Sequence, residues 1–95
     1  MKSLTGIIVN GSKDTLSMIS ITFDIYDVDD FKIEDTLAYT DSLSPGGKWK
    51  FEAMVTEDAA FKAVPVELTG HPDQATQSIQ VQEGEGQLEL LEYDW

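Results

Sequence analysis

The chain has 95 residues, of which 41% are hydrophobic and 25% are charged, and its 18 acidic residues against six lysines give a net charge of -12. This mixture is typical of one small globular domain, and the charge disfavours binding to nucleic acid and to anionic membrane surfaces. The absence of cysteine excludes disulfides, thiolate metal sites and cysteine nucleophiles.

The first half of the chain contains three predicted β-strands, and the second and third of them show the alternation of apolar and polar residues that is typical of half-buried strands. The first is Leu4–Asn10, and the clearest is Met18–Asp27. The apolar side of this second strand is formed by Ile19, Ile21, Phe23 and Ile25. The apolar side of the third is formed by Phe31, Ile33, Leu37 and Tyr39. In a regular strand Asp35 would point to the same side as these apolar residues. A charged residue on that side predicts a bulge or a break in the strand near it.

Two further strands are predicted in the second half of the chain. One places Trp49, Phe51, Ala53 and Val55 on a single face. The other carries Val64, Val66 and Leu68. Pro65 interrupts this last set and cannot donate a hydrogen bond to a neighbouring strand, so the strand is expected at a sheet edge or with a local bulge.

The segments between these strands have the composition of turns. We expect turns at Asn10–Ser12, Asp27–Asp30, Ser44–Gly47 and Gly70–Asp73, and a single helical turn at Glu57–Ala60. Short strands separated by such turns predict an all-β antiparallel sandwich or barrel, here as one domain over residues 1–95.

Residues 73–95 allow two interpretations. A hairpin across Glu83–Gly86 would pair one arm, with Ile79 and Val81, with a second arm that contains Leu88 and Leu90, and it would complete a second sheet. The alternative is an acidic tail, because glutamine and glutamate dominate the segment. Both arms alternate over a short length, which favours the hairpin.

Between Leu4 and Leu68 the chain resembles the FxLYD domain family. The segment Phe23–Asp27, FDIYD, is similar to the family signature with isoleucine in place of leucine, and Gly6–Asn10 is similar to its opening strand. A Pro-Gly turn leads into an aromatic strand in both. The residues that carry the likeness after the opening strand are Phe23, Ile25, Tyr26, Asp27, Pro45, Gly46, Trp49 and Phe51.

The resemblance implies an immunoglobulin-like β-sandwich of about seven strands, without enzymatic activity or a cofactor. It also implies an extracellular or cell-envelope location in a prokaryote, with the cytoplasm as the alternative. No apolar stretch follows Met1–Leu4, so we expect no signal peptide in this chain. One departure is visible, because Asp29 and Asp30 stand where the family has a glycine in a turn; aspartate tolerates the left-handed conformation better than most residues.

An acidic cluster is the candidate metal site. Asp27, Asp29, Asp30 and Glu34 have loop spacings at which carboxylates can converge on one calcium ion, although the pattern is not an EF-hand. The simpler interpretation is a solvated turn. In that interpretation Asp27 accepts hydrogen bonds from backbone N–H groups two residues on, and the Tyr26 hydroxyl reaches a backbone carbonyl.

Two other polar motifs indicate a structural role and not catalysis or ligand binding. His71 is the only histidine, so neither a zinc site nor a catalytic relay is expected from it. Asn10-Gly11-Ser12 matches a glycosylation acceptor in form, but a turn is the better interpretation.

The chain ends in two aromatic residues, Tyr93 and Trp95, which are the candidate partner-binding residues. They could stack on a sugar, insert into a partner's groove, or pack back on the sandwich and fix the last strand. The sequence therefore predicts a non-enzymatic module with a protein-binding or structural role, and a homodimer through an edge strand is an option. The alternative is a weak calcium- or carbohydrate-binding module.

Overall fold

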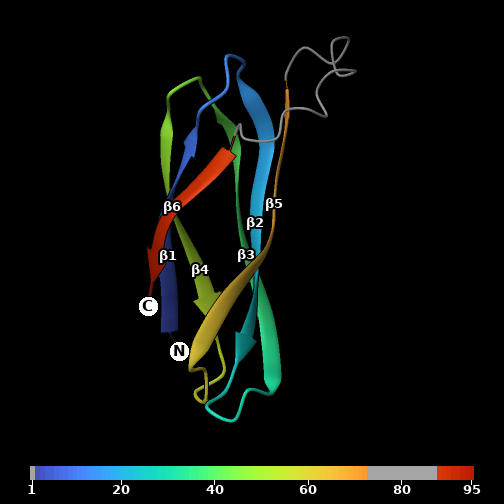
Figure 1. Ribbon diagram of the computed structural model, residues 1–95, viewed down its shortest axis with the longest axis vertical. Coiled ribbons are helices and arrows are strands. Elements are labelled where there is room, and N and C mark those ends of the chain that lie inside the picture. Colours follow the sequence, from blue (N-terminus) through green and yellow to red (C-terminus); the bar gives the residue numbers. More distant parts are fainter. Residues whose placement is uncertain (1, 73–87) are drawn as a thin grey trace.

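The computed structural model describes residues 2–72 and 88–95, and every regular element in these ranges is a β-strand. The strands are β1 (Lys2–Asn10), β2 (Leu16–Tyr26), β3 (Lys32–Leu43), β4 (Lys48–Val55), β5 (Lys62–Pro72) and β6 (Leu88–Asp94). They form two antiparallel sheets with strand orders β4-β1-β6 and β3-β2-β5 (Figure 1). The all-β antiparallel prediction is confirmed, with six strands in the described part of the chain where about seven were expected. None of the described segments forms a long apolar helix of the kind that crosses a bilayer.

The core lies between the two sheets and is built around β2 and β4. All four apolar residues predicted for β2 are fully buried, and Phe51, Ala53 and Val55 of β4 are buried as predicted. The Phe23 ring packs against the Phe51 ring with 5.8 Å between centroids, and the Trp49 ring centroid also lies 5.8 Å from that of Phe51. Period-two alternation therefore identified the faces of β2 and β4 correctly.

The prediction for β3 is confirmed for Ile33, which packs against the core, and is wrong for Leu37 and Tyr39, which face outward. Phe31 precedes the strand and is exposed. Leu37 and Tyr39 pair with Thr22 and Ser20 on the outer face of β2, whereas Ala38 pairs with the buried Ile21. The inner face of β3 is accordingly mostly polar, with Glu34, Thr36 and Thr40 opposite buried residues of β2. The expected bulge is present near Asp35, as a register shift opposite Ile25 and Tyr26.

The β5 strand lies at a sheet edge and has a register shift beside Pro65, as the sequence predicted. This shift moves Val64 and Val66 to exposed positions, and Leu68 alone of the predicted set packs against the core. The turn expected at Gly70–Asp73 is not seen as far as Pro72, because β5 continues to that residue. Asp73 lies outside the described residues.

The C-terminal strand β6 pairs with β1 and not with a neighbour in the sequence. Gly6 is buried where these strands meet, and a Cβ atom built there would lie 2.5 Å from the Phe51 ring. A register shift follows between Ile7 and Ile8. The second arm of the predicted hairpin is thus a strand that completes a sheet, whereas the first arm, with Ile79 and Val81, lies outside the described residues.

The two connections on either side of β4 are tight turns, as predicted. Ser44–Gly47 closes with a hydrogen bond from Gly47 N to Ser44 O at 2.8 Å, and Gly46 has a φ of 78°. Glu57–Ala60 forms one hydrogen-bonded turn, from Ala60 N to Glu57 O at 3.2 Å. These turns fix the ends of β4 against β3 and β5.

Candidate functional site

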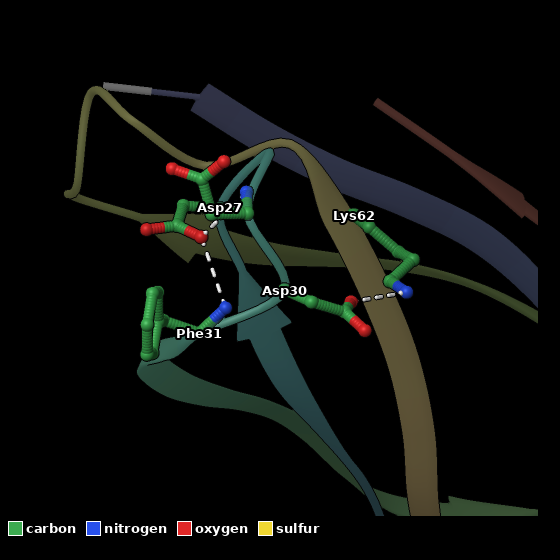
Figure 2. Close-up of polar contacts among 5 residues, drawn as sticks. Asp27, Asp30, Phe31 and Lys62 are labelled. Atoms are coloured by element: carbon green, nitrogen blue, oxygen red, sulfur yellow. Dashed lines mark hydrogen bonds and ion pairs between the residues drawn. The ribbon is translucent and has the colours of Figure 1, made fainter.

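Asp27 organises the turn between β2 and β3. Its Oδ1 atom accepts hydrogen bonds from the backbone N–H groups of Asp29 and Phe31, both at 2.9 Å. The backbone closes the same turn, from Asp27 N to Phe31 O at 2.9 Å and from Asp30 N to Asp27 O at 3.0 Å. Figure 2 shows the Asp27 side chain turned toward the Phe31 amide. The local role predicted for Asp27 is therefore confirmed.

Asp30 has two structural tasks in this turn. Its φ of 72° lies in the left-handed region, which aspartate tolerates better than most residues, so the turn forms here without a glycine. Its Oδ1 atom also receives the Lys62 ammonium group at 2.7 Å (Figure 2). Through this hydrogen bond and its charge, Asp30 raises the pKa of Lys62 above 10.5. The same ammonium group lies 5.4 Å from the centre of the Tyr26 ring.

Glu34 points away from the turn and caps the loop after β4. Its carboxylate accepts hydrogen bonds from Thr56 N at 3.2 Å, from Thr56 Oγ1 at 3.3 Å and from Glu57 N at 3.1 Å. It therefore joins two strands that belong to different sheets. No spacing rule could have identified this partner, because Thr56 is 22 residues away in the sequence.

The four carboxylates of the candidate calcium site thus have separate environments. Asp27 binds its own turn, Asp30 binds Lys62, and Glu34 binds the loop after β4. Asp29 is exposed beside them and contributes its backbone N–H to Asp27. Within the described residues, no group of three or more acidic or histidine side chains is placed to hold a metal ion. The structure does not bring these four side chains together at one point.

Asn10 is a structural centre that the turn interpretation understated. The side chain is fully buried, and its Nδ2 atom donates to Asp14 O at 2.9 Å and to Leu43 O at 2.8 Å. Its Oδ1 atom accepts from Ser12 N at 2.9 Å, and Gly46 N donates to its carbonyl at 2.7 Å. Because both amide hydrogens are used inside the fold, Asn10 does not present a glycosylation acceptor. The signal in the sequence was this polar residue at the end of the strand predicted over Leu4–Asn10.

Tyr26 and His71 have less specific surroundings. Among the described residues, no hydrogen-bond acceptor reaches the Tyr26 hydroxyl, so the expected bond to a backbone carbonyl is not seen; its ring carries the Lys62 contact instead. His71 is exposed in β5 opposite Ser17, whose hydroxyl lies 3.5 Å from the His71 carbonyl oxygen.

Tyr93 and Trp95 pack back on the sandwich and remain partly exposed. The Tyr93 ring lies 5.3 Å from Phe23, and its hydroxyl donates to Ala63 O at 3.4 Å. Trp95 Nε1 donates to Phe61 O at 3.4 Å. The two chain ends lie near each other (Figure 1), with the Lys2 ammonium group 5.5 Å from the centre of the Trp95 ring. Both aromatic residues are thus positioned by the start of β5, and whether they bind a partner stays a prediction.

A third aromatic side chain, Phe61, is exposed on the segment that Trp95 contacts. Phe61 is 59% exposed and Trp95 is 41% exposed. We use the name β5–β6 rim for Phe61, Tyr93 and Trp95. Phe61 was missed in the sequence because it stands outside every alternating segment, directly before Lys62.

A second exposed apolar pair lies on the outer face of β3. Leu37 is 54% exposed and Tyr39 is 72% exposed. Their neighbours across β2 are the polar residues Thr22 and Ser20.

Comparison with protein-family models, with curated proteins and with solved structures finds no match for this chain. The resemblance to the FxLYD family therefore stays a prediction from the sequence motifs.

Proposed function

We propose that this chain is a non-enzymatic β-sandwich module that binds a partner protein through the β5–β6 rim. The observation that carries the proposal is that three partly exposed aromatic side chains, Phe61, Tyr93 and Trp95, lie where the end of β6 contacts the start of β5, on a chain with a net charge of -12. Contiguous apolar surface on a small domain commonly marks a protein contact. Tyrosine and tryptophan are also the side chains that most often dominate the affinity of such contacts.

The geometry of the rim supports this role because its two large anchors are held in place before a partner arrives. The Tyr93 hydroxyl and the Trp95 indole both bond to backbone carbonyls at the start of β5. Side chains that are already ordered lose less conformational entropy on binding. The surrounding negative charge would steer a positively charged partner toward the module.

The chemistry of the side chains supports a binding role over catalysis. The sequence has no cysteine, and its single histidine, His71, is exposed on β5. A nucleophile or general base usually works beside a second group that activates it. His71 lies opposite Ser17 in the strand register, and the contact between them involves the His71 backbone carbonyl, not the imidazole.

The motifs shared with the FxLYD family support a location for this module at the cell envelope or outside the cell. Fractionation of the cells that produce the chain tests this location. Recovery with the envelope or the medium would support it, and recovery in the cytosol would contradict it.

Site-specific photo-crosslinking tests the binding role. A benzoylphenylalanine in place of Phe61 puts the crosslinker in the β5–β6 rim, and the same group in place of Tyr39 gives a matched control on the outer face of β3. We expect one defined protein to crosslink from position 61 and not from position 39, and the yield to fall in the W95S background. Crosslinking only from position 39, or from neither position, would overturn the proposal.

A further inference from the structure

The free edge of β6 differs from the other sheet edges in what protects it. Within the described residues, β6 pairs with β1 alone, so its second edge has no neighbouring strand. Natural edge strands usually carry lysine or proline, which discourage pairing with another chain. Lysines are present in β3, β4 and β5, and β5 also has Pro65, whereas Leu88–Asp94 contains neither lysine nor proline.

The two faces of β6 have opposite character. Leu88 and Leu90 lie opposite the buried residues Asn10 and Ile8, so they face the core, yet both remain partly exposed. A strand added at this edge would cover them. The outer face of β6 carries acidic residues opposite β1. These are Glu89, Glu92 and Asp94, which lie opposite Val9, Ile7 and Thr5.

The charge on this outer face is not balanced nearby. Lys48 and Lys50 lie on the far side of β1, opposite Val9 and Ile7, and so two strand spacings from β6, or about 10 Å. Exposed charges at that separation are largely screened at physiological ionic strength. Glu89 and Glu92 form no ion pair within the described part of the chain. A lysine or arginine on an adjacent strand would lie directly beside them.

Charge decides between the possible occupants of this edge. A second copy paired β6 to β6 would bring acidic residues together, and each copy has a net charge of -12. Residues 73–87 of the same chain contain three acidic residues and no lysine, so they offer no positive charge to the acidic face of β6. A foreign segment with basic residues on one side and apolar residues on the other complements both faces of β6.

We propose that the β6 edge accepts an extended segment of a partner protein, in which lysine or arginine alternates with apolar residues, as a fourth strand of the β4-β1-β6 sheet. This inference rests on the proposed function, since β6 contains the rim anchor Tyr93 and leads into Trp95. Backbone hydrogen bonds would supply affinity, and the alternation of side chains would supply specificity.

The test uses the full chain, labelled for amide spectra, and a synthetic peptide of about nine residues in which lysine and valine alternate, long enough to span β6. One control peptide has the same composition with its lysines and valines in two blocks, and another has glutamate in place of lysine. We expect saturable shifts centred on Leu88–Asp94 and slower hydrogen exchange of β6 amides with the alternating peptide alone. Equal binding of the block peptide, or shifts spread over the whole surface, would overturn the proposal.

A charge-reversal pair sharpens the test. The E89K/E92K variant should weaken binding of the alternating peptide by at least about tenfold, because two attractive cross-strand contacts become repulsive. The D41K/E57K variant changes the net charge equally on exposed residues elsewhere and should keep the affinity within about twofold if non-specific charge attraction is minor. Equal loss in both variants would overturn the proposal.

Two results in the free protein would also overturn it. Protected outward amides of β6 without peptide would mean that the chain already covers this edge itself, and a dimer in sedimentation would mean that a second copy does. The proposed function fails separately, through the crosslinking at Phe61. If a partner crosslinks at position 61 but the peptide does not bind, the proposed binding function is supported. The proposal that a basic strand pairs with β6 is then overturned.

Discussion

The two open sides of the sandwich are closed in different ways. Where β3 meets β4, the polar inner face of β3 bonds directly to the other sheet: Thr36 Oγ1 donates to Met54 O at 2.7 Å, and Glu34 caps the loop at Thr56. Where β5 meets β6, the links are two longer hydrogen bonds at 3.4 Å, from Tyr93 and Trp95. The partly exposed aromatic residues Phe61, Tyr93 and Trp95 lie on this second side.

This difference separates a side that stabilises the fold from a side that is available for binding. The hydrogen bonds between β3 and β4 join the sheets along a polar seam. The β5–β6 side is instead held by aromatic rings that reach the Phe23 ring and stay partly exposed. Such rings can contact a partner without leaving the core, so the same residues can serve stability and binding.

The largest expected effect comes from filling the space where β6 joins the sandwich. In the G6A variant the new methyl group would lie 2.5 Å from the Phe51 ring and would also meet the Glu92 carbonyl. Because backbone must move, we expect the free energy of unfolding to fall by about 2 to 3 kcal/mol. Urea denaturation measures this, with the exposed neighbour Thr5→Ala as the control, expected within about 0.5 kcal/mol of the parent. Equal stability of the two variants would show that β6 does not pack closely on Gly6.

The second effect concerns the β3–β4 side. Glu34→Gln keeps the shape of the side chain but removes the charge that strengthens its hydrogen bonds to Thr56 and Glu57. We expect a loss of about 1 kcal/mol in urea denaturation, with Glu52→Gln on exposed β4 near zero. An unchanged stability for Glu34→Gln would contradict a structural role for this carboxylate.

These residues also show what the sequence could predict. The inward face of β2 and the turn at Asp27 follow from patterns within a few residues, and both were predicted. Beyond Ile33, the side of β3 that faces inward was predicted wrongly, because Glu34 and Thr36 have polar partners in β4 and its loop that the sequence of β3 does not reveal. The pairing of β6 with β1 could not be predicted either, because it also depends on contacts between residues that are far apart in the sequence.

The candidate site likewise contains features that the sequence predicted and features that depend on contacts between distant residues. Alternation and composition located Tyr93 and Trp95, but not the neighbours that make them part of a larger surface. Phe61 and Ala63 receive their hydrogen bonds from more than 29 residues away, a relation fixed only by the packing of the sheets. The four acidic residues were grouped by spacing, and the structure separates them: Asp30 binds Lys62, Glu34 binds Thr56, and Asp27 binds its own turn.

A smaller effect compares one hydroxyl group on each side. Thr36→Val removes a short hydrogen bond between the sheets and should lower the free energy of unfolding by about 1 kcal/mol. Tyr93→Phe removes a longer bond and keeps the ring on Phe23, so its cost should be about 0.5 kcal/mol at most. Paired denaturation curves measure both. A larger loss for Tyr93→Phe would mean that the β5–β6 side is closed as firmly as the other, and that its aromatic residues are not free to contact a partner.

The smallest effect lies in the lysines that flank the two sides. Asp24, and then Asp35, raises the pKa of Lys32 on β3, as Asp30 raises that of Lys62 on β5. A lysine whose folded pKa exceeds its unfolded value stabilises the fold below pH 10.5, and this contribution is lost as the pH rises through the folded pKa. Both pairs are exposed, so we expect only a slight loss of stability in that alkaline window.

The Asp30→Asn substitution separates the two lysines. It should return the pKa of Lys62 toward 10.5 and leave that of Lys32 raised, because only Lys62 is bonded to Asp30. Titration of the lysine side-chain carbons by magnetic resonance measures both values in one sample. Asparagine also tolerates the left-handed conformation, so the turn itself should survive. An unchanged pKa for Lys62 would show that the ammonium group does not hold Asp30 in solution, and that the start of β5 beside the rim is more loosely tied to the β2–β3 turn than the 2.7 Å contact implies.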